Sequence, residues 1–298
     1  MKIFNFLKIV LYAMHPKILV SIQYLYHFKK ILNWRNPKNI NEKINWLKFN
    51  SDTSLWSLCA DKYMVRKYIE NKGLADILVK LYGKWDKVED IDWDILPNQF
   101  VLKTNNGSGD ITICKNKASL DISAVIFKYS TLLNKSFSYT NGEPHYATMI
   151  PYLIVEELLD VSKQTVLTDT LIDYKIWCFN GTPHHIWACY NRFKDSVEVA
   201  TYDLSWNRHD EYSIFTSHYK KAKSDLPKPK SLEKMLTIAS KLSEGIPQVR
   251  IDLYEVGDKP YFGEMTFTSA GGFMNFYTPA FLKEMGDLVD LSLVKRKR

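Results

Sequence analysis

The segment VRIDLYEVGDKPYFGEMTF, residues 249–267, constrains the fold more than any other stretch of this chain. In its first half apolar and polar residues alternate, which places Arg250 and Asp252 on one face of an extended strand. In its second half Glu264 and Thr266 share a face for the same reason. A turn that contains glycine separates the halves, so the segment predicts an antiparallel hairpin with charged side chains on one side.

The register of this hairpin decides what its acids could do. If residues 257–259 form a three-residue loop, Asp252 lies directly opposite Glu264, with the carboxylates about 5 Å apart. Like charges in that position repel each other, and a divalent cation such as Mg²⁺ would offset the repulsion by binding hard oxygen ligands. Arg250 on the same face adds a group that binds anions. A surface hairpin with solvated acids explains the same spacing, and the pattern favours the metal site.

A second unusual stretch is FVLKTNNGSGD, residues 100–110. It is not a Walker phosphate loop, because no Lys-Ser or Lys-Thr follows the glycines. It is not a dinucleotide fingerprint either, because a strand and not a helix follows Gly109. What fits is a strand, a glycine loop and a strand, whose backbone N–H groups could cover phosphates with Lys103 beside them. A plain tight turn explains the pattern equally well.

The segment LIVEELL ends an apolar strand with two acids, Glu156 and Glu157. Exposure at a strand end is one explanation. The other is a hinge between domains, where a carboxylate and the backbone meet an adenine and a ribose.

The remaining patterns predict a mixed α+β fold with antiparallel hairpins. Helical spacing covers residues 40–72, with Asn39 or Asn41 as the N-terminal cap, and it recurs over 119–135 and 232–245. An Asn-Gly pair at 180–181 predicts a second hairpin.

Composition narrows the class of partner and the compartment. The chain has 298 residues, and 40 Lys and Arg against 33 Asp and Glu give a net charge of +7, which favours an anionic partner. The basic run at 295–298 is typical of a solvated chain end, so we expect no nucleic-acid partner. Four cysteines without C-x-x-C spacing predict reduced thiols in a cytosolic protein, with neither a disulfide framework nor a zinc site.

The first 28 residues are rich in apolar and aromatic side chains. Charged residues and Pro16 interrupt them before the roughly 18 to 20 apolar residues that a membrane span needs. Two explanations fit: a helix packed on its own domain, or a helix lying on an anionic membrane surface with lysines beside its apolar face.

Taken in order, these segments resemble the ATP-grasp enzymes, and within them the teichuronopeptide-biosynthesis (TupA-type) branch of bacterial surface-polysaccharide clusters. The resemblance rests on DKYMVRKYI, FVLKTNNGSGD, VEELL, DYKIWCFNGTP and VRIDLYEVGDKPYFGEMTFTSAGGF, within residues 61–273. It implies two α+β subdomains that grip ATP, preceded by a helical region. We therefore expect a helical N-terminal region at 1–50, an N-terminal part of the core at 51–97, a lid subdomain at 98–158, and a C-terminal subdomain with the metal site at 159–298.

The resemblance also assigns residues to the nucleotide. It implies that Lys62 and Lys103 contact phosphates and that Asp173 or Lys175 lies near the ribose or phosphates. The glycine-rich lid and the adenine hinge would comprise Asn105, Asn106, Gly107, Ser108, Gly109, Glu156, Glu157 and Leu158.

The resemblance likewise assigns the metal ligands and the catalytic arginine. Asp252 and Glu264 match the acidic ligands, and Arg250 matches the arginine that steadies the transferred phosphoryl group, with Lys103 as a second catalytic cation. Thr266 stands where much of the superfamily has an asparagine as the third ligand, and threonine is a shorter and weaker oxygen donor.

The implied function is an ATP-dependent carboxylate–amine ligase that uses Mg²⁺, passes through an acylphosphate and releases ADP. Its partners would be an amino acid or amine and a uronic-acid-containing glycan or glycan precursor. We expect a cytoplasmic protein, at the inner face of the membrane if its N-terminal segment lies on lipid. The alternatives are a glycosyltransferase of capsule or lipopolysaccharide biosynthesis, which the absence of a compact D-x-D disfavours, and a non-catalytic binding protein docked on a membrane.

Overall fold

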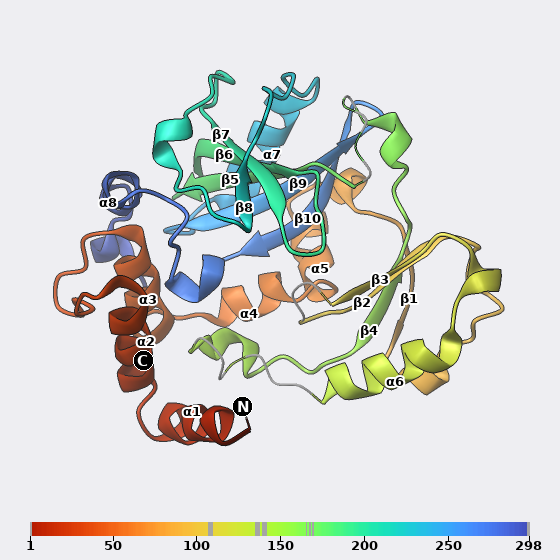
Figure 1. Ribbon diagram of the computed structural model, residues 1–298, viewed down its shortest axis with the longest axis horizontal. Helices are drawn as coiled ribbons and strands as arrows, with labels where there is room; N and C mark the ends of the chain where they lie inside the picture. Colours follow the sequence, from red (N-terminus) through yellow and green to blue (C-terminus); the bar gives the residue numbers. More distant parts are fainter. Residues whose placement is uncertain are drawn as a thin grey trace.

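Two β-sheets organise the computed structural model of this chain, which describes residues 2–106, 110–134, 138, 142–164, 166, 168 and 170–296 (Figure 1). The described α-helices are α1 (Lys2–Met14), α2 (Pro16–Phe28), α3 (Ile40–Asn50), α4 (Ser54–Ala60), α5 (Met64–Asn71), α6 (Ile122–Leu133), α7 (Leu232–Ser243) and α8 (Pro279–Asp287). The strands are β1 (Leu81–Trp85), β2 (Phe100–Thr104), β3 (Ile111–Cys114), β4 (Leu153–Glu156), β5 (Asp173–Phe179), β6 (Thr182–Tyr190), β7 (Val197–Tyr202), β8 (Tyr219–Lys221), β9 (Val249–Val256) and β10 (Lys259–Thr266).

The larger sheet has the strand order β10-β9-β5-β6-β7-β8 and is antiparallel except where β7 pairs with β8. Both predicted hairpins lie in it. Asn180 and Gly181 join β5 to β6 with φ values of 48° and 84°, the left-handed conformations of a two-residue hairpin turn. The helix α7 contacts β5, β6 and β9, so one face of this sheet is buried beneath it.

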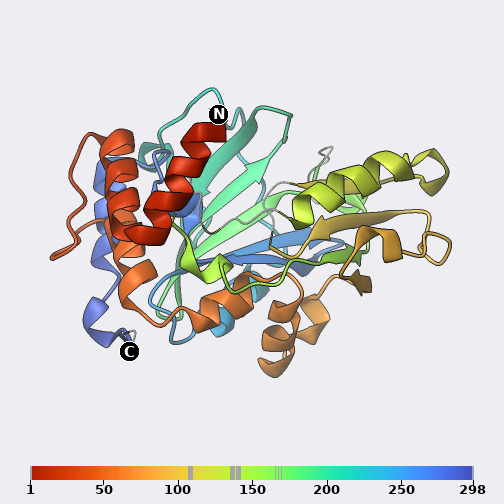
Figure 2. The ribbon, with the colours of Figure 1, turned by 90° about the horizontal axis from the view of Figure 1, so that it is seen from below.

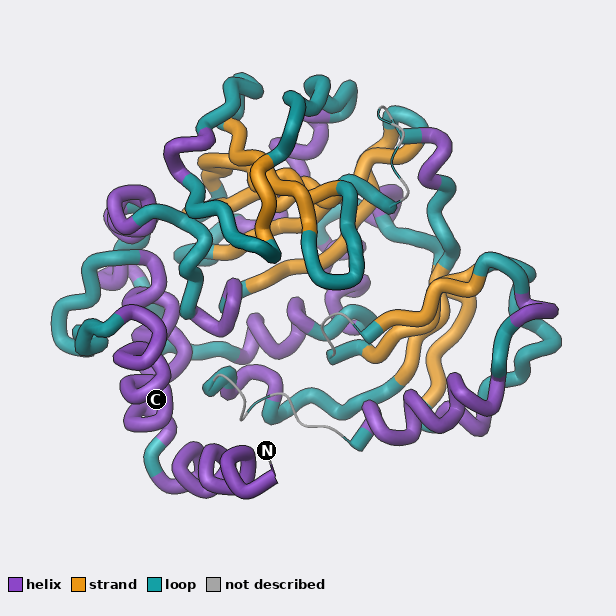
Figure 3. Tube along the Cα trace, in the orientation of Figure 1, coloured by secondary structure: helices purple, strands orange, loops and turns teal. Residues whose placement is uncertain are grey.

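The smaller sheet has the order β1-β4-β2-β3 and is antiparallel throughout. Its strand β4 ends at Glu156, so Glu157, the second acid of the LIVEELL segment, lies beyond the ladder. The helix α6 covers this sheet through Val125 and Tyr129, and the Tyr129 hydroxyl donates to the carbonyl of Leu102 at 2.7 Å. Figure 3 shows the two sheets as separate bodies of strand.

The N-terminal helices lie beside α3 at one end of the molecule (Figure 2). The cap of α3 is Asn39, whose side chain accepts from the Glu42 amide in a capping box, as the sequence predicts. The helix α2 buries Val20 and Tyr24 against Leu32 and Phe273, so it packs on its own domain. Within the described residues, no helix is both long enough and apolar enough to cross a membrane. The α+β prediction is confirmed.

Candidate active site

The hairpin β9–β10 carries the predicted acids and closes on a turn of two residues. Gly257 and Asp258 have φ values of 60° and 61°, and Val256 pairs with Lys259 across them. Two successive left-handed residues match the twist of the flanking strands. The prediction of a three-residue loop at 257–259 is therefore wrong, because Lys259 belongs to the strand.

The predicted pairing of Asp252 with Glu264 is nevertheless confirmed, because an irregularity in β10 offsets the shorter turn. After a two-residue turn, an uninterrupted ladder would place Gly263 opposite Asp252. Instead the register shifts between Phe262 and Glu264, so that Glu264 pairs with Asp252. A β-bulge at Gly263 thus turns the Glu264 side chain to the face that carries Asp252.

Replacing Gly263 by alanine is expected to destabilise the fold by about 1 to 3 kcal/mol and to lower activity. An added Cβ would lie 3.0 Å from the backbone oxygen of Asp252 and 3.1 Å from the Tyr254 ring, so the bulge must shift. Urea unfolding measures the stability, and ADP release measures the activity. Gly245→Ala is the control: its φ is 72° with no atom within 4 Å, so it should lose about 1 to 2 kcal/mol and keep its rate. A Gly263→Ala protein with normal stability and rate would contradict this role of the bulge.

Asp252 lies at the centre of a buried ion-pair network. Its side chain is 1% exposed, and Arg250 binds both of its oxygens, with Nε and Nη2 each at 2.7 Å. Lys175 stands opposite Asp252 on β5, and its Nζ lies 2.5 Å from Oδ2. Burial raises the pKa of the Asp252 carboxyl, whereas the charges of Arg250 and Lys175 act in the opposite direction.

Glu264 occupies the open side of the network, with a side chain that is 42% exposed. Its Oε1 lies 3.1 Å from Nη2 of Arg250 and accepts from the Thr266 hydroxyl at 3.0 Å. Burial acts to raise the pKa of the Glu264 carboxyl, but Lys175, Arg250 and Lys62 outweigh it and lower the pKa to about 2. Glu264 is therefore ionised at neutral pH.

Asp173 extends the network along β5. Its Oδ2 pairs with Lys175 and lies 3.5 Å from Nη2 of Arg192. Its Oδ1 is buried and has no hydrogen-bond partner in the described protein. The structure thus brings Asp173, Lys175 and Asp252 together, with one carboxylate oxygen of Asp173 buried and unpartnered.

The smaller sheet contributes a second charged group. Lys103 on β2 and Glu156 on β4 form an ion pair, with Nζ 2.5 Å from Oε2, and Arg66 of α5 lies 3.4 Å from Oε1. Glu157 is exposed and Leu158 is partly buried, so of the predicted hinge residues only Glu156 points into the charged group.

Lys62 connects the two charged groups. It lies between α4 and α5, and its backbone N–H donates to the carbonyl of Asn105, which follows β2, at 3.1 Å. Burial lowers the pKa of the Lys62 ammonium; Glu264 is the strongest charge that opposes this, and Lys103 lowers the pKa further. Charged residues on both sheets therefore act on the Lys62 ammonium.

Asn105 holds the start of the glycine-rich loop in place. Its Nδ2 donates to Asp61 Oδ2 at 2.6 Å and to the Ile150 carbonyl at 3.0 Å, and its Oδ1 accepts from the Tyr152 amide at 3.0 Å. All of these bonds are internal to the protein, so the Asn105 side chain has a structural role.

Asn106 is also buried, and its Oδ1 has no hydrogen-bond partner in the described protein. That oxygen could accept from a ligand beside the loop. The rest of the predicted lid, Gly107, Ser108 and Gly109, lies outside the described residues.

Four residues of the charged groups and their surroundings are not among the site residues predicted from the sequence: Asp61, Arg66, Arg192 and Ser269. Ser269 accepts from Nη1 of Arg250 at 2.9 Å, and Asp61 caps α5 by accepting from the Met64 amide at 3.0 Å. Of these four residues, only Asp61 gives a signal in the sequence, as an acid that precedes a helix. Such an acid predicts where the helix starts and not which distant residues it will contact.

The donor set fits Mg²⁺. The two paired acids, Asp252 and Glu264, both offer hard oxygen ligands. In the part of the chain that the structure describes, no group of three or more His, Cys, Asp or Glu side chains is placed to hold a metal ion, so two acids are the protein's share. Mg²⁺ typically binds one or two carboxylates and takes its other ligands from phosphates and water. Arg250 and Lys175 neutralise Asp252 here, so metal binding would compete with at least one of these ion pairs.

Removing divalent cations with a chelator is expected to stop ADP formation, and adding Mg²⁺ is expected to restore it. The reason is that two opposed carboxylates and the phosphates of ATP need a cation between them. A titration of ADP release against free Mg²⁺ measures this. ADP formation that persists in excess chelator would show that Arg250 and Lys175 suffice to neutralise the acids.

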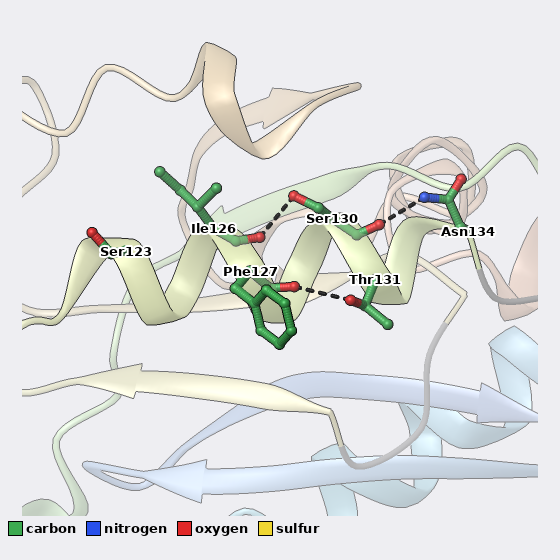
Figure 4. A pocket seen from close by; sticks show the side chains of 6 residues that line it. All are labelled: Ser123, Ile126, Phe127, Ser130, Thr131 and Asn134. Carbon is green, nitrogen blue, oxygen red and sulfur yellow. Dashed lines mark hydrogen bonds between the residues drawn. The ribbon is translucent and has the colours of Figure 1, made fainter.

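A surface depression of about 660 Å³ lies away from the charged groups. Figure 4 shows its lining on α6: Ser123, Ile126, Phe127, Ser130, Thr131 and Asn134. It contains no carboxylate and no cation, so it lacks the groups that a nucleotide triphosphate and its metal need.

Comparison with protein families gives one match. A family model described as TupA-like ATPgrasp matches residues 42–290, which include every charged residue of the site. No curated protein matches this chain in sequence.

Similar solved structures include a D-alanine–D-alanine ligase from Bacillus anthracis, with a TM-score of 0.46 and 15% identity over 81% of this chain and 69% of that one. The corresponding ligase from Helicobacter pylori has a TM-score of 0.44 and 13% identity over 85% and 67% of the two chains. An N5-carboxyaminoimidazole ribonucleotide synthetase from Thermus thermophilus has a TM-score of 0.40 and 11% identity over 72% and 47%. Likenesses this distant carry no conclusion about activity.

Proposed function

This chain belongs to the TupA-like ATP-grasp family, and from that premise we propose that it joins an amino acid or amine to a uronic-acid-containing glycan or glycan precursor. As a family member it binds ATP and is an ATP-dependent carboxylate–amine ligase. The amide, the glycan and the use of Mg²⁺ are the parts that we propose.

The observation that carries the proposal is a pair of charged groups on different sheets, with the backbone of Lys62 bonded to Asn105 just after β2. One group holds Lys103 and Glu156, and the other holds Asp252 and Glu264. Phosphoryl transfer needs positioning and charge neutralisation more than covalent help from the protein. A triphosphate that spans the two groups would meet lysines along its length and carboxylates for its metal at one end.

In the proposed reaction a carboxylate oxygen of the glycan attacks the γ-phosphorus of ATP and ADP leaves. The resulting acylphosphate is attacked by the amine, phosphate departs with that oxygen, and an amide remains. Lys62 and Lys103 hold phosphate oxygens, and Arg250 neutralises charge on the transferred phosphoryl group. Mg²⁺, held by Asp252 and Glu264, would supply further charge neutralisation at the phosphates.

The glycan is the substrate class that membership in the TupA-like family suggests. An assay of ADP release from ATP and Mg²⁺, with uronic acids and amino acids supplied in pairs, tests the proposal. We expect ADP only when both a carboxylate and an amine are present. ADP release that ignores the uronic acid and follows a different carboxylic acid would reject the glycan substrate while leaving the ligase chemistry in place.

A further inference from the structure

The helices α1 and α2 carry apolar side chains that the rest of the described chain leaves uncovered. In α2, Ile18, Ile22 and Leu25 recur at helical spacing on one face, while Val20 and Tyr24 face the core. Among the side chains of this segment that the structure describes, the exposed large apolar ones are Ile9, Val10, Met14, Ile18, Ile22, Leu25, Tyr26 and Ile31, and we call them the N-terminal apolar face. Because α2 already buries its other side, this face is not needed to hold the helix on the domain.

The same segment carries the whole net charge of the protein. Residues 1–41 contain seven basic residues and no acidic one, whereas residues 42–298 contain 33 of each sign. The seven are Lys2, Lys8, Lys17, Lys29, Lys30, Arg35 and Lys38. An apolar face beside a purely basic segment is the arrangement with which helices lie in the interface of an anionic membrane.

Local contacts fit the same partner. The Lys29 ammonium lies 4.9 Å from the centre of the Tyr26 ring, and the Tyr26 side chain is 72% exposed. A depression of about 450 Å³ is lined by residues 31–35, which include the exposed side chains of the apolar Ile31 and the cationic Arg35. Phospholipids offer the complementary pair, an acyl chain next to a phosphate.

We propose that the N-terminal apolar face docks this enzyme on the surface of an anionic lipid bilayer. A second copy of the chain fits the face less well, because a symmetric pair would bring two segments of seven basic residues together. In Figure 1 α1 forms the lower edge of the molecule, and in Figure 2 it lies in front of the body. The inference does not depend on which substrate the site takes.

Flotation with vesicles tests the docking. We use the full chain with phosphatidylcholine vesicles that contain either no anionic lipid or about 30% phosphatidylglycerol, at low and high salt. The protein should float with the anionic vesicles at low salt. With neutral vesicles, or at high salt, most of it should remain in the bottom fraction of the gradient. The double variant Ile22→Ser/Leu25→Ser should lower the bound fraction about tenfold, because each truncation removes apolar area from the contact. Both side chains are about half exposed, so folding should survive, and a thermal melt checks this.

The matched control is Phe127→Ser/Ile150→Ser, which removes two side chains that are 79% and 76% exposed elsewhere on the surface. It should float like the unmodified protein. The proposal fails if the unmodified protein does not float with anionic vesicles, or if both double variants bind equally. It also fails if sedimentation shows a dimer that Ile22→Ser/Leu25→Ser turns into a monomer, because a second copy then covers the face. If the unmodified protein forms no ADP in lipid-free solution, that result counts against the proposed function and not against membrane docking.

Discussion

Glu264→Gln is expected to lower the rate of ADP formation by about 10² to 10³-fold and to leave the protein folded. The amide keeps the shape of the side chain but removes an anionic oxygen ligand from the pair with Asp252. Because the Glu264 side chain is 42% exposed, water offsets part of its lost ion pairs, so the stability loss should be smaller than that of Asp252→Asn. Steady-state ADP release at saturating ATP measures the effect, with circular dichroism as the check on folding.

Asp252→Asn should remove activity to the same degree, but with a different effect on stability. Asp252 is 1% exposed between Arg250 and Lys175, so its loss leaves two cations without their shared partner. We expect a loss of about 3 to 5 kcal/mol in the free energy of unfolding. Glu244→Gln is the control: this acid pairs with Lys72 at the surface and is 76% exposed, so both its rate and its stability should stay normal. Normal turnover in Glu264→Gln would refute the metal-ligand assignment.

Arg250→Lys is expected to reduce kcat for ADP formation by about 10² to 10³-fold. Arg250 binds both oxygens of Asp252 and also reaches Glu264 and Ser269, and a lysine ammonium cannot make this planar fork. Kinetics at varied ATP should show the loss mainly in kcat, because the charge acts on the transferred phosphoryl group.

Arg208→Lys is the matched control for that variant. Arg208 is also mostly buried and pairs with two acids, Asp210 and Asp225, but it makes no contact with the proposed site. It should lose some stability and keep its kcat. If Arg250→Lys and Arg208→Lys had the same kinetics, Arg250 would have only a structural role.

The sequence predicts the fold class and both hairpins because their signals are local. Alternation of apolar and polar residues gives the faces of β9, and the pair Asn180-Gly181 gives the turn between β5 and β6. The exact pairing of residues across the β9–β10 hairpin could not be predicted in the same way. A bulge is invisible to alternation, and a loop predicted one residue too long compensated for the bulge at Gly263. The steric demand on Gly263 appears only when its neighbours across the strand are known.

The charged groups could be predicted only in part. Acids and lysines inside conspicuous motifs, such as Asp252 and Lys103, stand out in the sequence. Their partners do not, because they come from distant parts of the chain: Lys175 binds Asp252 across 77 positions, and Arg66 binds Glu156 across 90. Asn105 is a further example, since a residue of the expected phosphate loop makes its hydrogen bonds inside the protein.

The fate of one oxygen atom tests the central claim most directly. A uronic-acid substrate labelled with ¹⁸O in its carboxylate is incubated with the enzyme, ATP, Mg²⁺ and an amine, and the released phosphate is examined by mass spectrometry. If the carboxylate attacks the γ-phosphorus and an amine then displaces phosphate, each phosphate carries one labelled oxygen and ADP forms in equal amount. Phosphate without label, or formation of AMP and pyrophosphate, would contradict the account.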